Sequence, residues 1–388
     1  MLEAVRPIAE RWGADRHARQ RRQSLDAADF AELADAGVPL AGASTEHGGL
    51  FESVASSTRG IAEILRALAA GDASVALVAS MHPAVLSFWH STEEVPEPHT
   101  DAWAAQRDAV SQAAAEGAWF GTITSEPGSG GDVARTMAIA EPRRDGRWDV
   151  SGHKHFGSGS GITSYMLTTA RPDPEHEPDW FLLDVRGVPW DGSAGIELVA
   201  EWDGHGMIAT QSHGMRFTAF PASRFAWPGH WRELSENAGP FVGCAFTAVI
   251  AGIVDAAMAT AREALRPRGD GLNAFEQVAW ADAEQDAWLL RQAFEGMLTA
   301  VEREPQPLRS VLLGKTACAR LAEDCLRRLT RIMGGGAYAR HSPFGFWFED
   351  VRALGYLRPP WGLAYDTLIG SAFAAPAAVA AAEAPARS

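Results

Sequence analysis

Hydroxyl-bearing residues and glycines gather in Thr124–Asp132, the segment TSEPGSGGD, which follows the β-like run WFGTI. Its three glycines and its proline allow a sharp turn and a close approach of the backbone to a ligand. Rossmann and P-loop phosphate sites need a strand that runs into a helix, and the P-loop adds GK[ST]. Here VARTMAIAEP predicts a second strand, and no GK[ST] follows. The segment therefore predicts a hairpin turn or a wall against a flat cofactor.

A second glycine-rich run, HKHFGSGSG, carries Phe156, Ser158 and Ser160. Taken alone, this run predicts a glycine-rich hairpin. Histidines also occur near both runs, but without the spacing that a metal ion requires of its ligands. We therefore expect no metal site among His153, His155, His205 and His213.

Helical spacing of apolar residues covers the chain up to about residue 116 and returns after residue 230. Between these parts lie short β-rich runs, among them YMLTTA, DWFLLDV and HGMRFTAF, separated by turn sequences. The later helices break at RPRGDG and EREPQP, and a last helix begins near Leu363. This order predicts an α+β, mainly α, fold with an antiparallel sheet rather than a doubly wound fold. The predicted parts are an N-terminal all-helical domain at 1–116, a central β-domain at 117–230, a C-terminal helical domain at 231–373 and a loosely held tail at 374–388.

The composition limits the classes of partner. The chain has 388 residues, 46% of them hydrophobic and 21% charged, as in a soluble globular protein. Its net charge of -15 argues against nucleic acid and anionic membranes as partners. The apolar run 241–261 predicts a buried bundle helix rather than a membrane span, and the start of the chain has no apolar signal-peptide core. The sparse thiols Cys244, Cys318 and Cys325 predict buried, reduced cysteines and a cytoplasmic protein.

Five motifs in order resemble the acyl-CoA dehydrogenase superfamily of flavoproteins over essentially the whole chain. They are EHGG, TSEPGSGGD, DVSGHKHFGSGSG, WDGHGMIATQSH and RIMGGGAYARHSPFGFWFEDVRA. The resemblance implies an N-terminal helical domain, a central antiparallel β-domain and a C-terminal four-helix bundle. It also implies a flavin between the β-domain and the bundle, often across a subunit contact, and therefore a homodimer or homotetramer.

The resemblance also implies which residues hold the cofactor, FAD, with FMN as the alternative. The segment around Thr124–Asp132 lies along the flavin ring in the family, where a polar edge needs hydrogen bonds. An aromatic side chain stands beside the ring, a hydroxyl follows two residues later, and a glycine run approaches the pyrophosphate. The family's usual serine before the final aspartate is Gly131 here, and its usual glutamine before the glycine run is Arg331. The residues carried over are Thr122, Thr124, Ser125, Phe156, Ser158, Arg331, Gly334, Gly335 and Gly336.

The catalytic base of the dehydrogenases is missing from both positions that the family uses. Removal of an α-proton from an acyl thioester needs a carboxylate whose pKa is raised by burial. Ungapped matching places Arg358 at the commoner position, within EDVRALGYLRPPWG, and Gly239 near the rarer one. Asp366 and Glu236 are candidates for a displaced carboxylate.

Three functions remain open. The first is α,β-dehydrogenation of a small acyl substrate, free or bound to CoA or a carrier protein, with a displaced base such as Asp366 or Glu236. The second is a two-component monooxygenase that uses a C4a-hydroperoxyflavin and takes reduced flavin from a partner reductase. The Phe-Gly-Ser-Gly-Ser-Gly run resembles that branch, in which His82 and the hydroxyls of Ser158 and Ser160 could serve, although a histidine on an apolar helix is usually a core residue. The C-terminal histidine often seen in that branch is absent from EDVRALGYLRPP. The third is a catalytically dead homologue that binds flavin or a partner. Family frequency favours the first function, and the residues favour the second.

Overall fold

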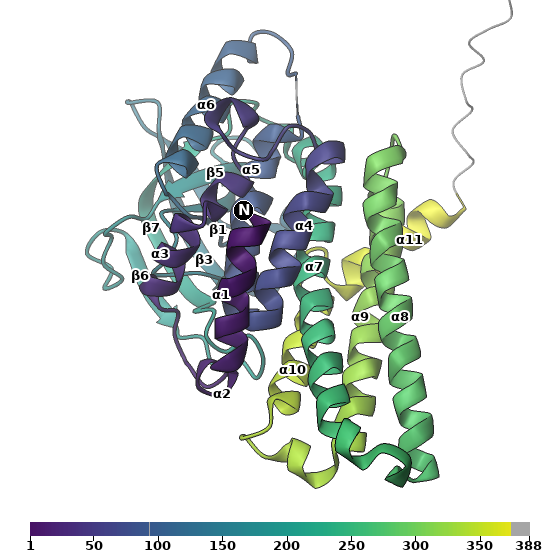
Figure 1. Cartoon of the computed structure of the whole chain (residues 1–388). Helices are drawn as coiled ribbons and strands as arrows, with labels where there is room; N and C mark the ends of the chain where they lie inside the picture. Colours follow the sequence, from purple (N-terminus) through teal and green to yellow (C-terminus); the bar gives the residue numbers. More distant parts are fainter. Residues whose placement is uncertain (93, 374–388) are drawn as a thin grey trace, which may run out of the picture.

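The computed structural model describes residues 1–92 and 94–373, so the tail predicted at 374–388 lies outside the described residues. The chain begins with helices, as the periodicity predicts, and helices α4 and α5 pack against the long helix α7 farther along the chain (Figure 1). The first helices are α1 (Leu2–Ala14), α2 (Arg16–Arg19), α3 (Ala27–Asp35), α4 (Val54–Gly71), α5 (Ala73–His90) and α6 (Thr100–Ala115).

A buried ion network fixes the start of α5. The Asp72 side chain caps this helix by accepting a hydrogen bond from Val75 N. It also pairs with Arg19 and Arg22, and both arginines pair with Asp29. This network ties the turn after α2 to α3 and α5.

The strands form one sheet that closes on itself. Its order is β1-β4-β2-β3-β7-β5, β5 pairs back with β4, and β6 pairs with β7. The strands are β1 (Phe120–Thr122), β2 (Ile139–Pro142), β3 (Trp148–Gly157), β4 (Tyr165–Pro172), β5 (Asp179–Asp184), β6 (Ile196–Ala200) and β7 (His213–Arg224).

Two sequence predictions about this sheet are wrong in part. The sheet is mixed, because β4 runs parallel to both β1 and β2, while the other pairs are antiparallel. The strand predicted at VARTMAIAEP begins only at Ile139. The reason is local, since the amides of Met137 and Ala138 donate to the Glu126 carboxylate instead of to a neighbouring strand.

The chain then returns to helices, broken where the sequence predicts. Short helices η4 (Arg266–Gly271) and η5 (Gly334–Tyr338) lie at the ends of the long ones. The helices of this part are α7 (Trp231–Leu265), α8 (Ala274–Arg303), α9 (Leu308–Met333), α10 (Pro343–Val351) and α11 (Trp361–Ala372). Three long helices, α7, α8 and α9, pack side by side, with α10 and α11 against α9 (Figure 1).

Helix α7 is a core helix. By length and composition, 231–269 is the one described segment that could cross a membrane, but 89% of its apolar window is buried inside the structure. It packs against α4, α5, α8 and α9. The buried thiols of Cys318 and Cys325 face the same core, and burial raises the pKa of each to about 12. The predicted buried helix and buried cysteines are confirmed.

Candidate active site

A buried ion pair organises the TSEPGSGGD segment. Lys154 Nζ, on β3, donates to Glu126 Oε1 at 2.5 Å and to the Thr169 carbonyl at 2.5 Å. The Glu126 carboxylate also accepts hydrogen bonds from Thr136 Oγ1 and from Met137 N. Burial opposes ionisation of Glu126, but the Lys154 ammonium and these donors outweigh it and lower the pKa of the carboxyl. The pair holds the residues on both sides of the glycine turn in place.

The turn itself packs against a segment near the C-terminus. Gly131 has φ +82°, and a Cβ on it would lie 3.1 Å from Pro360 Cγ. The glycine that stands in place of the family's usual serine is therefore explained by the backbone and by this neighbour. Gly131 and Pro360, which follows two residues after Arg358, therefore lie together in space.

Replacement of Gly131 by Ala is expected to cost about 1 kcal/mol more than the same change at Gly130. Both glycines have positive φ, which costs an L-residue roughly 1–2 kcal/mol, but a Cβ on Gly130 meets nothing within 4 Å. The difference, measured by urea unfolding, isolates the contact with Pro360. Equal losses of unfolding free energy in the two variants would show that Pro360 moves aside without strain.

Arg358 stands beside the same loop. Its Nη2 donates to Thr124 Oγ1 at 2.7 Å, so the Thr124 hydroxyl that the resemblance assigns to the flavin has a protein partner. Burial lowers the pKa of Arg358 to about 10, and the Asp132 carboxylate opposes this shift. The guanidinium is therefore charged at neutral pH.

Lys315 on α9 fixes the turn that carries Arg358. Its Nζ donates to the carbonyl oxygens of Leu354, Leu357 and Pro359 at 2.9, 3.0 and 2.9 Å. The side chain is 2% exposed, and burial lowers the pKa of its ammonium to about 8. Three backbone contacts from one ammonium leave this turn little freedom to move.

Phe156 and Ser158 form the other side of the site. Phe156 has φ +60°, and 57% of its surface is exposed, next to the edge of Trp202. A large apolar ring held in an unfavourable backbone conformation and left uncovered is typical of a ligand wall. The backbone of Thr122 pairs with that of Ser158, and the backbone of Ser125 with that of His155. The structure thus brings Thr122, Thr124, Ser125, Phe156 and Ser158 together.

A chain of hydroxyl groups leads away from Ser158. Its Oγ lies 2.8 Å from Ser212 Oγ, which lies 2.7 Å from Thr210 Oγ1. Thr210 Oγ1 donates to the Met207 carbonyl at 2.8 Å, and a carbonyl can only accept. With one proton per hydroxyl, Ser212 donates to Thr210 and Ser158 donates to Ser212. The remaining lone pairs of Ser158 Oγ are left to accept a hydrogen bond.

The Met207 loop is anchored by a buried carboxyl group. Asp350 Oδ1, on α10, accepts a hydrogen bond from Met207 N at 2.6 Å. Burial raises the pKa of Asp350 to about 7, the Met207 amide opposes the shift, and the nearby Asp72 adds to it. Gly206 lies so close to this helix that a Cβ would sit 2.4 Å from the Glu349 carbonyl. The hydroxyl chain therefore ends on a loop fixed by α10.

The candidate bases do not enter this arrangement. Asp366 on α11 and Glu236 on α7 are both exposed. His82 is fully buried, its Nε2 lies 2.7 Å from the Pro39 carbonyl, and its Nδ1 accepts from Phe120 N. Burial lowers the pKa of His82 to about 4, so the ring is a neutral core residue. Of the four catalytic candidates, Arg358 alone reaches the loop of Thr124.

The residues predicted to contact the cofactor's pyrophosphate lie on other elements than the Thr124 loop. Arg331 and the glycines 334–336 are exposed at the end of α9 and in η5. No hydrogen bond joins them to the β-domain within residues 1–92 and 94–373. Their role at a cofactor stays a prediction, as does the subunit contact that would complete such a site.

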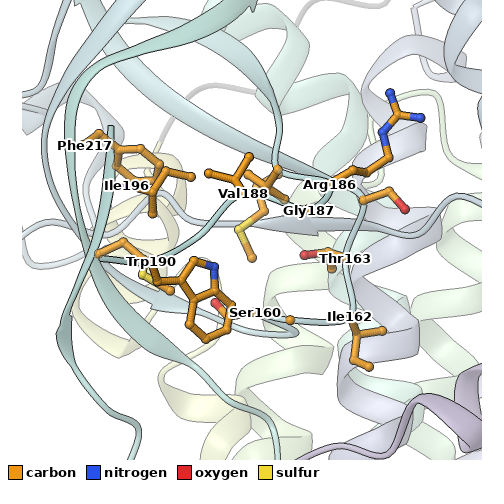
Figure 2. A pocket seen from close by; sticks show the side chains of 14 residues that line it. Ser160, Ile162, Thr163, Arg186, Gly187, Val188, Trp190, Ile196 and Phe217 are labelled. Atoms are coloured by element: carbon orange, nitrogen blue, oxygen red, sulfur yellow. The ribbon is translucent and has the colours of Figure 1, made fainter. Parts of the chain in front are cut away.

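A cavity of about 370 Å³ opens beside the glycine-rich turn (Figure 2). Its walls come from the turn at Ser160, from the loop with Trp190, and from Phe217 on β7. Trp190, Ile196 and Phe217 face it from one side and Thr163 from the other (Figure 2). None of the predicted flavin residues lines it. It is a separate hollow that shares only the GSGSG turn with the site.

Sequence reasoning missed three buried charged groups: Lys154, Lys315 and Asp350. Lys154 stands between outward-facing His153 and His155 in a strand, and Lys315 lies on the apolar face of α9. A charged residue at a position that the pattern predicts to be buried indicates that its charge has a buried partner. The partners themselves could not be read from the pattern.

Comparisons with known proteins give distant relatives. No protein-family model matches the chain. It is 26% identical to the amino sugar nitrososynthase DnmZ of Streptomyces peucetius in an alignment of 252 residues that covers 59% of this chain and 59% of that protein. The match thus spans less than two thirds of DnmZ. It is 25% identical to the dibenzothiophene monooxygenase of Mycolicibacterium goodii in an alignment of 318 residues that covers 73% of this chain and 72% of that protein.

Solved structures show the same fold. FMN-bound TdsC from Paenibacillus sp. A11-2 matches with a TM-score of 0.78 at 20% identity, covering 96% of both chains. Butyryl-CoA dehydrogenase from Megasphaera elsdenii matches with a TM-score of 0.80 at 18% identity, covering 96% of this chain and 97% of that one. The resemblance that the five motifs indicated is thereby confirmed: the chain is a divergent protein with the acyl-CoA dehydrogenase-like fold and with similarity to the monooxygenase branch.

Proposed function

We propose that this protein is a flavin-dependent monooxygenase that receives reduced flavin from a partner reductase. The observation that carries the proposal is Arg358, which stands where the dehydrogenases of the family have their base and donates to Thr124 Oγ1. A guanidinium that stays protonated cannot accept an α-proton. The exposed Asp366 and Glu236 offer no buried carboxylate in its place.

The residues present fit a flavin. The uncovered ring of Phe156 provides an apolar wall. The backbone and hydroxyl groups of Thr122, at the end of β1, and of Ser125, in the loop that follows, adjoin it through the pairings of Thr122 with Ser158 and of Ser125 with His155. FMN fits this wall as well as FAD does, and it is the flavin named with TdsC. When bound and reduced, the flavin supplies the electrons that activate O₂.

A flavin bound with its N5 at Ser158 Oγ would be held preferentially in its reduced form. Reduced flavin carries an N–H at N5, where oxidised flavin has a bare acceptor nitrogen. The hydroxyl chain leaves Ser158 Oγ as a hydrogen-bond acceptor, which suits the N–H and not the bare nitrogen. The buried surroundings of Ser158 and Ser212 strengthen this selection, because water cannot substitute for the partner.

The test compares the affinities for reduced and oxidised FMN under anaerobic conditions. We expect reduced FMN to bind at least tenfold more tightly. Ser158→Ala should abolish most of the difference, and Ser160→Ala should leave it intact, because Ser160 Oγ donates only within its own turn, to the Gly157 carbonyl. Titration with acyl thioesters should leave the spectrum of bound oxidised flavin unchanged.

Two results would contradict the proposal. Bleaching of bound flavin by butyryl-CoA would establish the dehydrogenase, the function of one protein with this fold. Failure to bind FMN or FAD in either redox state would remove both enzymatic functions and leave a protein that acts without flavin.

A further inference from the structure

Arg358 is a charged group with an incomplete set of partners. A guanidinium has five N–H donors, and among the residues that the structure describes one donor of Arg358 has a partner, Thr124 Oγ1. Within residues 1–92 and 94–373 no carboxylate oxygen lies within 4.0 Å of it. By contrast, Arg19 pairs with Asp29 and Asp72. Arg358 therefore lacks the carboxylate contacts that Arg19 has.

The charges around Arg358 do not neutralise it at contact distance. The Asp132 carboxylate attracts the guanidinium from a distance, while its Oδ1 accepts from Ala134 N as the cap of a short helix. Lys154 lies near enough that Arg358 helps to lower the pKa of its ammonium, after the larger effect of burial. Two positive charges close together are costly unless an anion comes close, and the cost grows as solvent is removed.

The geometry around the guanidinium is fixed before any ligand arrives. Lys315 holds the carbonyls on both sides of Arg358, at Leu357 and Pro359. Thr124 lies in the loop that Glu126 and Lys154 secure. The Thr124 hydroxyl accepts from Arg358, so its own proton is free to donate to a ligand oxygen. Part of the Arg358 side chain remains accessible to solvent.

We propose that Arg358 and Thr124 form an oxyanion-binding site that takes the carboxylate or phosphate group of the organic substrate. The assignment of this anion to a substrate rests on the proposed function; the anion site itself does not. Planar N–H pairs bind carboxylates and phosphates in a bidentate manner, and a neighbouring hydroxyl adds a third donor. The proposed substrate is therefore an organic acid or a phosphate ester, held by its anion next to the wall of Phe156.

Calorimetric titration of the flavin-free protein with benzoate and with inorganic phosphate tests this site. We expect one of the two probes to bind to the wild type and to lose at least tenfold in affinity in Arg358→Gln. Arg358→Lys should retain part of the affinity, because lysine keeps the positive charge but lacks the planar pair of N–H donors. Thr124→Val should weaken binding severalfold. Arg186→Gln, which removes an exposed arginine paired with Asp184, is the matched control and should bind as the wild type does.

The choice of probes distinguishes a carboxylate substrate, a phosphate-ester substrate and the phosphate group of FMN. Dependence of benzoate binding on Arg358 identifies a carboxylate substrate, and dependence of phosphate binding alone identifies a phosphate ester. FMN and riboflavin are compared in parallel: a loss of FMN affinity in Arg358→Gln with riboflavin unchanged assigns Arg358 to the cofactor and overturns the proposal. Unchanged benzoate and phosphate binding in a folded Arg358→Gln, or no binding to the wild type, also overturns it. Binding of an anion to a protein that binds no flavin would keep this site and reject the monooxygenase.

Discussion

Replacement of Glu126 by Gln is expected to lower the free energy of unfolding by about 3–5 kcal/mol, because it leaves the charge of a buried lysine without its carboxylate partner. Lys154 is 0% exposed, and Glu126 is its ion-pair partner at 2.5 Å. Glutamine would also present an amide group where the carboxylate accepts from Met137 N and Ala138 N. Urea unfolding followed by far-ultraviolet circular dichroism measures the loss.

Two further variants make this prediction specific. Asp145→Asn breaks an exposed ion pair with Arg147 and should cost far less stability than Glu126→Gln, because solvent screens that pair. The double variant Glu126→Gln with Lys154→Met removes both charges and should be more stable than Glu126→Gln alone. A cost below 1 kcal/mol for Glu126→Gln would mean that Lys154 is neutral in the folded protein, which its pKa of about 8 argues against at pH 7.

Replacement of Asp350 by Asn is expected to remove a large part of the pH dependence of stability between about pH 4 and 7. Burial raises the pKa of Asp350 from 3.8 to about 7, so in this range the folded protein keeps a proton that the unfolded chain has lost. Stability therefore falls as the pH rises through this window and levels off above the folded pKa. Three pK units correspond to roughly 4 kcal/mol.

The variant Asp350→Asn has no carboxyl to titrate and can still accept from Met207 N through its amide oxygen. Its unfolding free energy should exceed that of the wild type at pH 8 and approach it near pH 4. Asp324→Asn changes an accessible carboxylate that pairs with Arg327, away from Asp350, and serves as the control. A wild-type slope between pH 4 and 7 that survives in Asp350→Asn would show that Asp350 is ionised in the folded protein.

Local patterns in the sequence were enough for the succession of elements. Helical periodicity and the breakers RPRGDG and EREPQP predicted the three long helices that the structure shows as α7, α8 and α9. Glycine in TSEPGSGGD and in GSGSG predicted turns, which these segments form. These features depend on near neighbours in the chain, so the amino-acid types carry the information.

The sequence by itself also determined which residue types stand at the positions of the family motifs, including an arginine where a glutamate is usual. Tertiary structure decided what that arginine does. Arg358 meets Thr124 across 234 positions of the chain, and periodicity records that a side chain is buried without recording what buries it. The same holds for Lys154 with Glu126, for Lys315 with the turn before Pro360, and for Asp350 with Met207. Each charge is stable or active only through a partner from a distant segment, because Coulomb attraction and desolvation depend on separation in space and not along the chain.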